Sequence, residues 1–152
     1  MKRVITATDA GGASHFESVS DEQPAFAELW VSAAGDPLLA AASAGGGATR
    51  LEPPPRGTSF RVFELPDDAI VAEYLRSQGA PGIERDGFHR TNTLDYVLIL
   101  DGEVTLELDS GAVTLGPGDC VVQRATSHAW RNKSGKAVRM AVVMVGLAAE
   151  PT

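Results

Sequence analysis

The sequence contains a single cysteine, Cys120, so no disulfide can form within the chain and the fold cannot depend on one. No apolar run approaches the roughly 18 residues that a membrane helix needs, and no apolar signal core follows Met1. Basic residues are also scarce, since 13 Lys and Arg stand against 20 Asp and Glu and leave a net charge of −7. A polyanion is therefore a poor partner. We expect a cytoplasmic protein that binds neither nucleic acid nor a membrane.

The first half of the chain alternates between short strand patterns and loops. Strand patterns cover residues 2–8, 15–18, 26–32 and 59–65. Residues 33–48 are small and glycine-rich, and we interpret the segment 44–48 either as a lid over a pocket or as a plain surface loop. Asp67 precedes apolar residues at helical spacing, which predicts one short amphipathic helix that ends at Gly79.

The second half of the chain has a β pattern throughout. Strands are predicted at residues 89–93, 95–100, 103–108, 112–115, 120–124, 128–132 and 138–145, with glycine-containing turns between most of them. Short strands at this even spacing favour an all-β sandwich or barrel. The 152 residues, of which 43% are hydrophobic, suit one domain with its own core, and we expect Cys120 inside it and His15 on the surface.

Polar residues that could take part in catalysis or metal binding follow the alternation of two predicted strands. Side chains in a strand repeat every two residues, so if His89 points inward, a defined set of residues after it also points inward. That set is Thr91, Thr93, Asp95, Val97 and Ile99. By the same rule His128 and Trp130 share one face of a later strand. Two imidazoles and one carboxylate are the ligands of a three-residue metal site that keeps positions open for water or substrate.

These residues resemble the two motifs of the cupin family. In the first motif His89 and Gly102 match, Thr91 replaces a second histidine, and Asp95 replaces a glutamate. In the second motif the matching residues are Gly118, Asp119, His128 and Asn132, with Gln123 at a proline position and Ala125 at a glycine position. The whole pattern is similar to that of small single-domain cupins.

The resemblance implies an all-β fold, a double-stranded β-helix or jelly-roll barrel, with additional N-terminal strands and one short helix. It implies one domain over residues 1–152, with the barrel core at residues 87–147 and the additional elements at residues 1–86. It also implies a divalent transition metal (Zn, Fe, Mn or Ni) held by His89, Asp95 and His128. Cupin sites commonly use three His and one Glu, so this ligand set is reduced, and Thr91 would be a weak ligand.

The candidate catalytic residues are His128 and His89. The candidate substrate-binding residues are Thr91, Thr93, Gln123, Thr126, Trp130 and Tyr96. Two alternatives stay open: a metal-free polar pocket in which His128 acts as acid or base, and an Asp95 that pairs with Arg90 or Arg124. Trp130 and Tyr96 are also suited to plain packing.

We expect a small-molecule enzyme that depends on a divalent metal. A metal that acts as a Lewis acid would suit a lyase, an isomerase or a cyclase, and Fe(II) would suit a dioxygenase. An apolar lining of Val97, Ile99, Leu106 and Trp130 indicates a partly apolar substrate. The alternative is a non-catalytic barrel that binds a small ligand as a sensor or carrier. Tyr96, Leu98 and Leu100 make the opposite face of the strand apolar as well, which predicts a homodimer.

Overall fold

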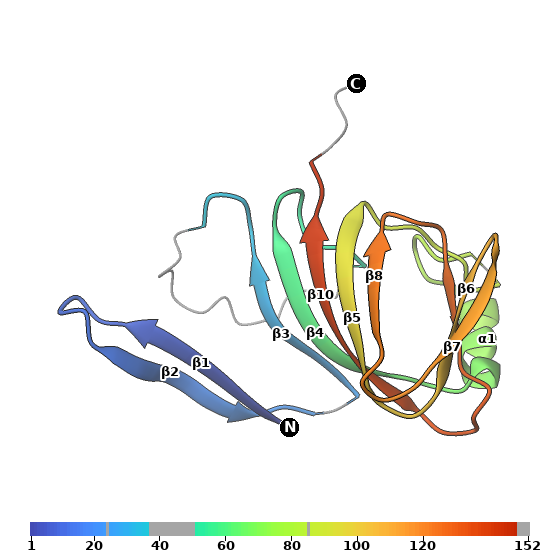
Figure 1. Cartoon of the computed structure of the whole chain (residues 1–152), viewed down its shortest axis with the longest axis horizontal. Helices are drawn as coiled ribbons and strands as arrows, with labels where there is room; N and C mark the ends of the chain where they lie inside the picture. The colour runs from blue at the N-terminus through green and yellow to red at the C-terminus, as the bar shows by residue number, and fades with distance from the viewer. Residues whose placement is uncertain (24, 37–50, 85, 149–152) are drawn as a thin grey trace.

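The computed structural model describes residues 1–23, 25–36, 51–84 and 86–148, and its described part is built almost entirely of antiparallel strands (Figure 1). A hairpin joins β1 (Lys2–Thr8) to β2 (Ser14–Asp21). The larger sheet has the order β3 (Phe26–Ser32), β4 (Thr58–Leu65), β10 (Val138–Gly146), β5 (Thr93–Asp101) and β8 (Cys120–Arg124). The smaller sheet has the order β7 (Gly111–Leu115), β6 (Val104–Leu108) and β9 (Ala129–Arg131).

The larger and smaller sheets form the two sides of a double-stranded β-helix, as the all-β prediction requires. The last strand, β10, lies at the centre of the larger sheet, between β4 and β5. Strand β5 then pairs with β8, whereas β6 pairs with β7 and β9 in the other sheet, so successive strands cross between the two sides. A backbone bridge between His89 and His128 links segments that lie outside the named strands.

The hydrophobic core lies between the two sheets and follows the alternation of β5 and β10. Its buried members are Val97, Ile99, Val104, Val138, Met140, Val142 and Met144. Inward residues of β10 alternate with half-buried ones along the whole strand, because side chains of a strand point to opposite faces in turn. Trp130 and Phe63 pack against this cluster.

The predicted helix is α1 (Asp68–Ser77), and it begins where the sequence indicated. The Asp67 side chain accepts a hydrogen bond from the backbone N–H of Ala69 at 3.0 Å, which satisfies one of the unpaired amides of the first turn. Asp68 fixes the helix to the barrel, because its carboxylate accepts the backbone N–H of Asn132 at 2.7 Å. The helix therefore lies beside the smaller sheet (Figure 1).

Two local predictions were wrong. Residues 89–93 do not form a strand: His89 takes part in isolated bridges with Ile83 and His128, and β5 starts only at Thr93, because this segment crosses from one sheet to the other. Cys120 is exposed, since Val121 and Gln123 supply the more buried positions of the edge strand β8 and the cysteine points the other way. His15 is exposed as predicted, and the segment 44–48 lies outside the described residues.

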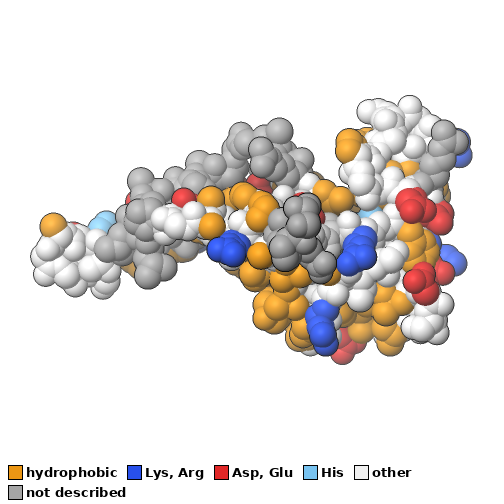
Figure 2. Space-filling view, turned by 90° about the horizontal axis from the view of Figure 1, so that it is seen from above, with side chains coloured by type: hydrophobic (Ala, Val, Ile, Leu, Met, Phe, Trp, Pro, Cys, Tyr) orange, Lys and Arg blue, Asp and Glu red, His pale blue; other side chains and the backbone are white. Residues whose placement is uncertain are grey.

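Apolar side chains are exposed on the outer face of the larger sheet. Tyr96, Leu98 and Leu100 on β5 keep 49%, 38% and 40% of their surface accessible, and Val122 on the neighbouring strand is exposed as well. The hairpin projects from the body and exposes Val4, Phe16 and Val19. Figure 2 shows hydrophobic side chains gathered along one side of the body. Since monomers rarely leave such a surface in water, the homodimer stays a prediction.

Leu98→Lys tests the predicted dimer. We expect the unchanged protein to have the mass of a dimer in size-exclusion chromatography with light scattering at micromolar concentration. The lysine should shift it to the monomer mass, because a buried unpaired charge opposes association. Val113→Lys is the control, because Val113 is exposed as well, at 53% against 38% for Leu98, but belongs to the smaller sheet. A monomeric unchanged protein would contradict the prediction.

Candidate functional site

A cavity of about 490 Å³ opens inside the barrel. Its wall is mainly apolar and includes Phe63, Val97, Trp130, Val142 and Met144. The polar groups of the wall are Arg61, His89, Thr91, Asp95, Gln123 and His128. An apolar cavity with a few converging polar groups is the usual form of a small-molecule site.

The two histidines meet through their backbones and their rings. Each backbone N–H donates to the carbonyl of the other residue at 3.0 Å, and the ring centroids lie 4.2 Å apart. His89 Nδ1 lies 3.1 Å from the Gly87 carbonyl and His128 Nδ1 lies 2.9 Å from the Thr126 carbonyl. A carbonyl only accepts, so both Nδ1 atoms donate, and in the neutral form of each ring Nε2 carries the lone pair.

Gln123 connects His128 to Asp95. Its Nε2 lies 3.1 Å from His128 Nε2 and donates to Asp95 Oδ2 at 3.2 Å. Gln123 and Asp95 face each other across the β5–β8 ladder, so the sheet register fixes this contact. The Gln123 amide donates to the lone pair of a neutral His128.

Burial explains the protonation states in this cluster. It lowers the pKa of His128 to about 4, against an opposing effect of the Thr126 carbonyl, and His89 lowers it further. His128 is therefore a neutral imidazole at neutral pH. Burial also raises the pKa of Asp95, while Thr93, Gln123 and Arg61 act in the opposite direction.

Arg61 is a site residue that the sequence analysis missed. It is buried on β4, and its Nε donates to Glu28 at 3.0 Å and to Ser59 at 2.7 Å, while Nη1 donates to the Leu51 carbonyl at 3.0 Å. The available signal was a charged residue two positions from Ser59 and Phe63 within a predicted strand. Its guanidinium brings a positive charge to the cavity wall.

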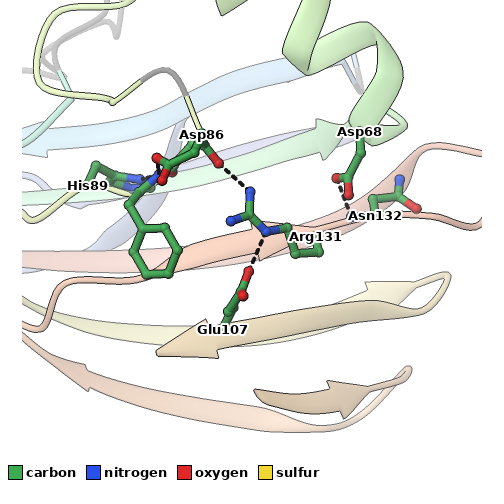
Figure 3. Close-up of polar contacts among 8 residues, drawn as sticks. Asp68, Asp86, His89, Glu107, Arg131 and Asn132 are labelled. Carbon is green, nitrogen blue, oxygen red and sulfur yellow. Dashed lines mark hydrogen bonds and ion pairs between the residues drawn. The ribbon is translucent and has the colours of Figure 1, made fainter. Parts of the chain in front are cut away.

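The segment that carries His89 is held by Arg131, which extends from β9 (Figure 3). Arg131 Nε donates to Glu107 at 2.5 Å, and Nη1 donates to the backbone carbonyl of Asp86. The guanidinium also lies 5.4 Å from the centroid of the Phe88 ring. These contacts fix the chain on the N-terminal side of His89, so that its backbone can meet that of His128.

The structure brings most of the predicted site residues together. His89, Asp95, His128, Thr91, Gln123 and Trp130 all line the cavity. Thr93 is buried beside Thr91, and their hydroxyl oxygens lie 2.7 Å apart. Thr126 has an exposed side chain and contributes its carbonyl to His128.

Other predicted contributors lie elsewhere. Tyr96 was wrong as a substrate-binding residue, because it alternates with Asp95 and points to the outer face of β5. Ile99 and Leu106 are buried in the protein but do not line the cavity, unlike Val97 and Trp130. Asp95 contacts Gln123 rather than Arg90 or Arg124.

The side chains of His89, Asp95 and His128 are chemically suited to bind a metal, but their arrangement is not. The Nε2 lone pairs of His89 and His128 and the Asp95 carboxylate are ordinary ligands of transition metals. In the part of the chain that the structure describes, however, no three His, Cys, Asp or Glu side chains form a group that could hold a metal ion. The Gln123 amide lies between His128 and Asp95 and engages both. The residues as arranged do not fit a three-ligand metal, and the set of His89, Asp95 and His128 stays a prediction.

Comparison with known proteins supports a likeness to cupins over part of the chain. The family model described as "Cupin domain" matches residues 78–145, which include β5 to β9 and most of β10. This segment is similar to a cupin domain. Among solved structures, a cupin family protein with a double-stranded β-helix fold from Methanocaldococcus jannaschii is 19% identical, with a TM-score of 0.43 over 59% of this chain and 70% of that one.

Curated relatives of the cupin domain come from fungi. "Phomopsin biosynthesis cluster protein D" from Diaporthe leptostromiformis is 50% identical over 64 residues, which are 41% of this chain and 33% of that protein. "Cupin-domain-containing oxidoreductase fogC" from Aspergillus ruber is 46% identical over 57 residues, which are 37% of this chain and 28% of that protein. The match thus spans about a third of the length of these relatives. In the described part of this chain, no helix has the length and apolar character needed to cross a membrane.

The low pKa of His128 predicts how stability depends on pH. The folded-state value of about 4 lies below the usual value of 6.5, so the unfolded state binds more protons between these pH values. The stabilisation is complete above pH 6.5 and is lost as the pH falls towards 4, by up to about 3 kcal/mol. Urea unfolding of chelator-treated protein at pH 7.5 and pH 4.5 should show a smaller loss in His128→Gln.

The matched control for this measurement is His15→Gln, because His15 is exposed and no packing depends on its charge. It should retain the pH dependence of the unchanged protein. An equal pH dependence in His128→Gln would show that His128 titrates normally in the folded state.

Proposed function

We propose that the barrel binds a small, largely apolar organic molecule and that His89 accepts a proton from it. The observation that carries this proposal is that the Nε2 atoms of His89 and His128 differ in their hydrogen bonding inside an apolar cavity. The Gln123 amide engages the lone pair of His128, whereas no hydrogen bond within the described residues engages that of His89. A neutral imidazole with an available lone pair, within reach of a bound molecule, is suited to general base catalysis.

The neighbouring groups favour such a proton transfer. His128 is neutral at neutral pH, and its ring centroid lies 4.2 Å from that of His89. The Asp95 carboxyl group lines the same cavity wall and interacts electrostatically with His89. The segment before His89 is fixed by Arg131, which keeps the ring in one place.

The relatives support the class of enzyme. Their names describe cupin-domain-containing oxidoreductases and a protein of a biosynthesis cluster. For this chain they support a small-molecule enzyme, and the proton transfer comes from the site itself.

Solvent exchange tests the proposal without knowledge of the product. We expect the protein to speed deuterium uptake from D2O next to the carbonyl of one or more bicyclic hydroxyketones, such as 6-hydroxy-2-tetralone, measured by mass spectrometry. His89→Gln should lower this rate about 100-fold or more, the lower end of what a positioned base contributes. His15→Gln should keep the full rate. Binding of the ketones without any exchange would instead favour a sensor or carrier.

A metal-dependent enzyme is the second candidate, and the shared tautomer of the two histidines favours it. Both Nδ1 atoms are engaged by carbonyls, which leaves both Nε2 atoms as the ligating atoms. Asp95 Oδ1 also lacks a donor among the described residues. A bound Zn, Fe, Mn or Ni would supply Lewis-acid chemistry, and Gln123 would have to leave His128 first.

Elemental analysis tests this second candidate. Protein purified without chelators should contain close to one equivalent of a transition metal, and His89→Ala and His128→Ala should each lose it because each removes one ligand. His15→Ala is the control and should keep the metal. A metal content far below one equivalent, or one unchanged in both variants, would contradict the metal-dependent enzyme.

A further inference from the structure

We infer that the molecule bound in the barrel carries a hydroxyl or N–H group that donates hydrogen bonds to Asp95 and Gln123. This inference rests on the proposed function and names the substrate class: a neutral molecule with an apolar body and one hydrogen-bond donor. Asp95 and Gln123 keep only 4% and 5% of their surface accessible, and both line the cavity. Asp95 Oδ1 and Gln123 Oε1 are buried, and no donor of the described residues reaches either atom.

The sheet places these two acceptors side by side. Asp95 on β5 and Gln123 on β8 are direct partners in the ladder, and the Gln123 amide nitrogen donates to Asp95 Oδ2 at 3.2 Å. That contact and the one with His128 engage the amide nitrogen of Gln123 and one carboxylate oxygen of Asp95. Asp95 Oδ1 and Gln123 Oε1 therefore remain without a hydrogen-bond donor among the described residues.

The orientation of the Gln123 amide follows from its neighbours. If its oxygen and nitrogen were exchanged, the oxygen would face the Asp95 carboxylate and the lone pair of His128. Three acceptors would then meet without a proton between them, since His128 Nδ1 already donates to the Thr126 carbonyl. Oε1 of Gln123 is therefore the atom that lacks a donor.

The buried amide of Asn132 has a full set of partners, and the other buried polar atoms that lack one among the described residues, on Arg3, Ser18 and Arg139, do not line this cavity. Asn132 is completely buried, and its Nδ2 donates to the carbonyls of Leu65 at 3.0 Å and Lys136 at 2.7 Å. Its Oδ1 accepts from the backbone N–H and the hydroxyl of Ser134. A buried acceptor without a donor lowers stability, so two of them at a cavity wall point to a partner that binds there.

These acceptors also determine which molecules the site rejects. A carboxylate or an ether oxygen at this position would face two further oxygens and no proton. Sites that hydrogen-bond a substrate hydroxyl discriminate strongly against analogues that lack it, because the buried groups are then left without partners. The apolar wall of Val97, Val142 and Met144 accepts the hydrocarbon part of the molecule.

Isothermal titration calorimetry with 2-naphthol and 2-methoxynaphthalene tests the inference, since the two probes share an apolar body and differ in the donor. We expect the protein as purified to bind 2-naphthol at least tenfold more tightly at pH 7. In Asp95→Asn the ratio should fall below threefold, because an amide can turn its NH2 group towards the ether oxygen. Asp101→Asn, at the exposed end of the same strand, should keep the tenfold preference.

Gln123→Met provides a second variant that removes the other acceptor and should also reduce the preference. Equal affinity for the two probes, or a preference for the ether, would overturn the inference and leave the proposed function standing. Retention of the full preference in both Asp95→Asn and Gln123→Met would overturn the assignment to these residues. Failure of both probes to bind would overturn the proposed apolar ligand and the inference with it.

Discussion

The pair of backbone hydrogen bonds between His89 and His128 is the constraint on which the site depends. These residues are far apart in the chain, yet each donates to the other at 3.0 Å in an isolated antiparallel bridge. The bridge places the rings 4.2 Å apart, and carbonyls two residues before each histidine fix both tautomers. Because the main chain makes these contacts, the backbone sets the geometry of the histidine pair. Arg131 and Glu107 hold the approach to this bridge from the smaller sheet.

Each row of paired residues across the larger sheet, here called a rung, contributes side chains to the barrel interior, and the rungs differ in polarity along the strands. Ile99, Met140 and Phe63 form an apolar rung, and the next inward rung contains Val97, Val142 and Arg61. The rung after that contains Asp95, Met144 and Ser59, with Gln123 beyond Asp95 on β8. Polarity thus rises from one end of the barrel to the other. The apolar end supplies burial, at about 25 cal/mol for each Å² of apolar surface, and the polar end holds the cavity.

Sequence alternation was enough to predict the inward set of β5 and the boundaries of β3 and β8, because one buried face makes the register of a strand unambiguous. It failed where a residue's environment depends on a distant segment of the chain. The segment 89–93 looked like a strand but crosses between sheets, and Arg61 was not predicted because its partner Glu28 lies on a different strand, β3. Cys120 was misplaced because nothing local distinguishes the two faces of a strand that is apolar on both sides. The contact from Gln123 to His128 joins different structural segments and has no signature in spacing.

Packing alone does not account for the polar end of the barrel. Replacement of a buried ion pair by well-packed apolar residues is often neutral or stabilising, and the strands of this sheet already accept Val97 and Val142 in the rung of Arg61. Yet Arg61 and Glu28 are buried as a pair, and Asp95 is buried although burial raises its pKa. Each of these groups lowers the stability that an apolar side chain would give at the same place. Their presence at one end, beside a histidine pair with fixed tautomers, is better explained by binding and chemistry in the cavity than by packing.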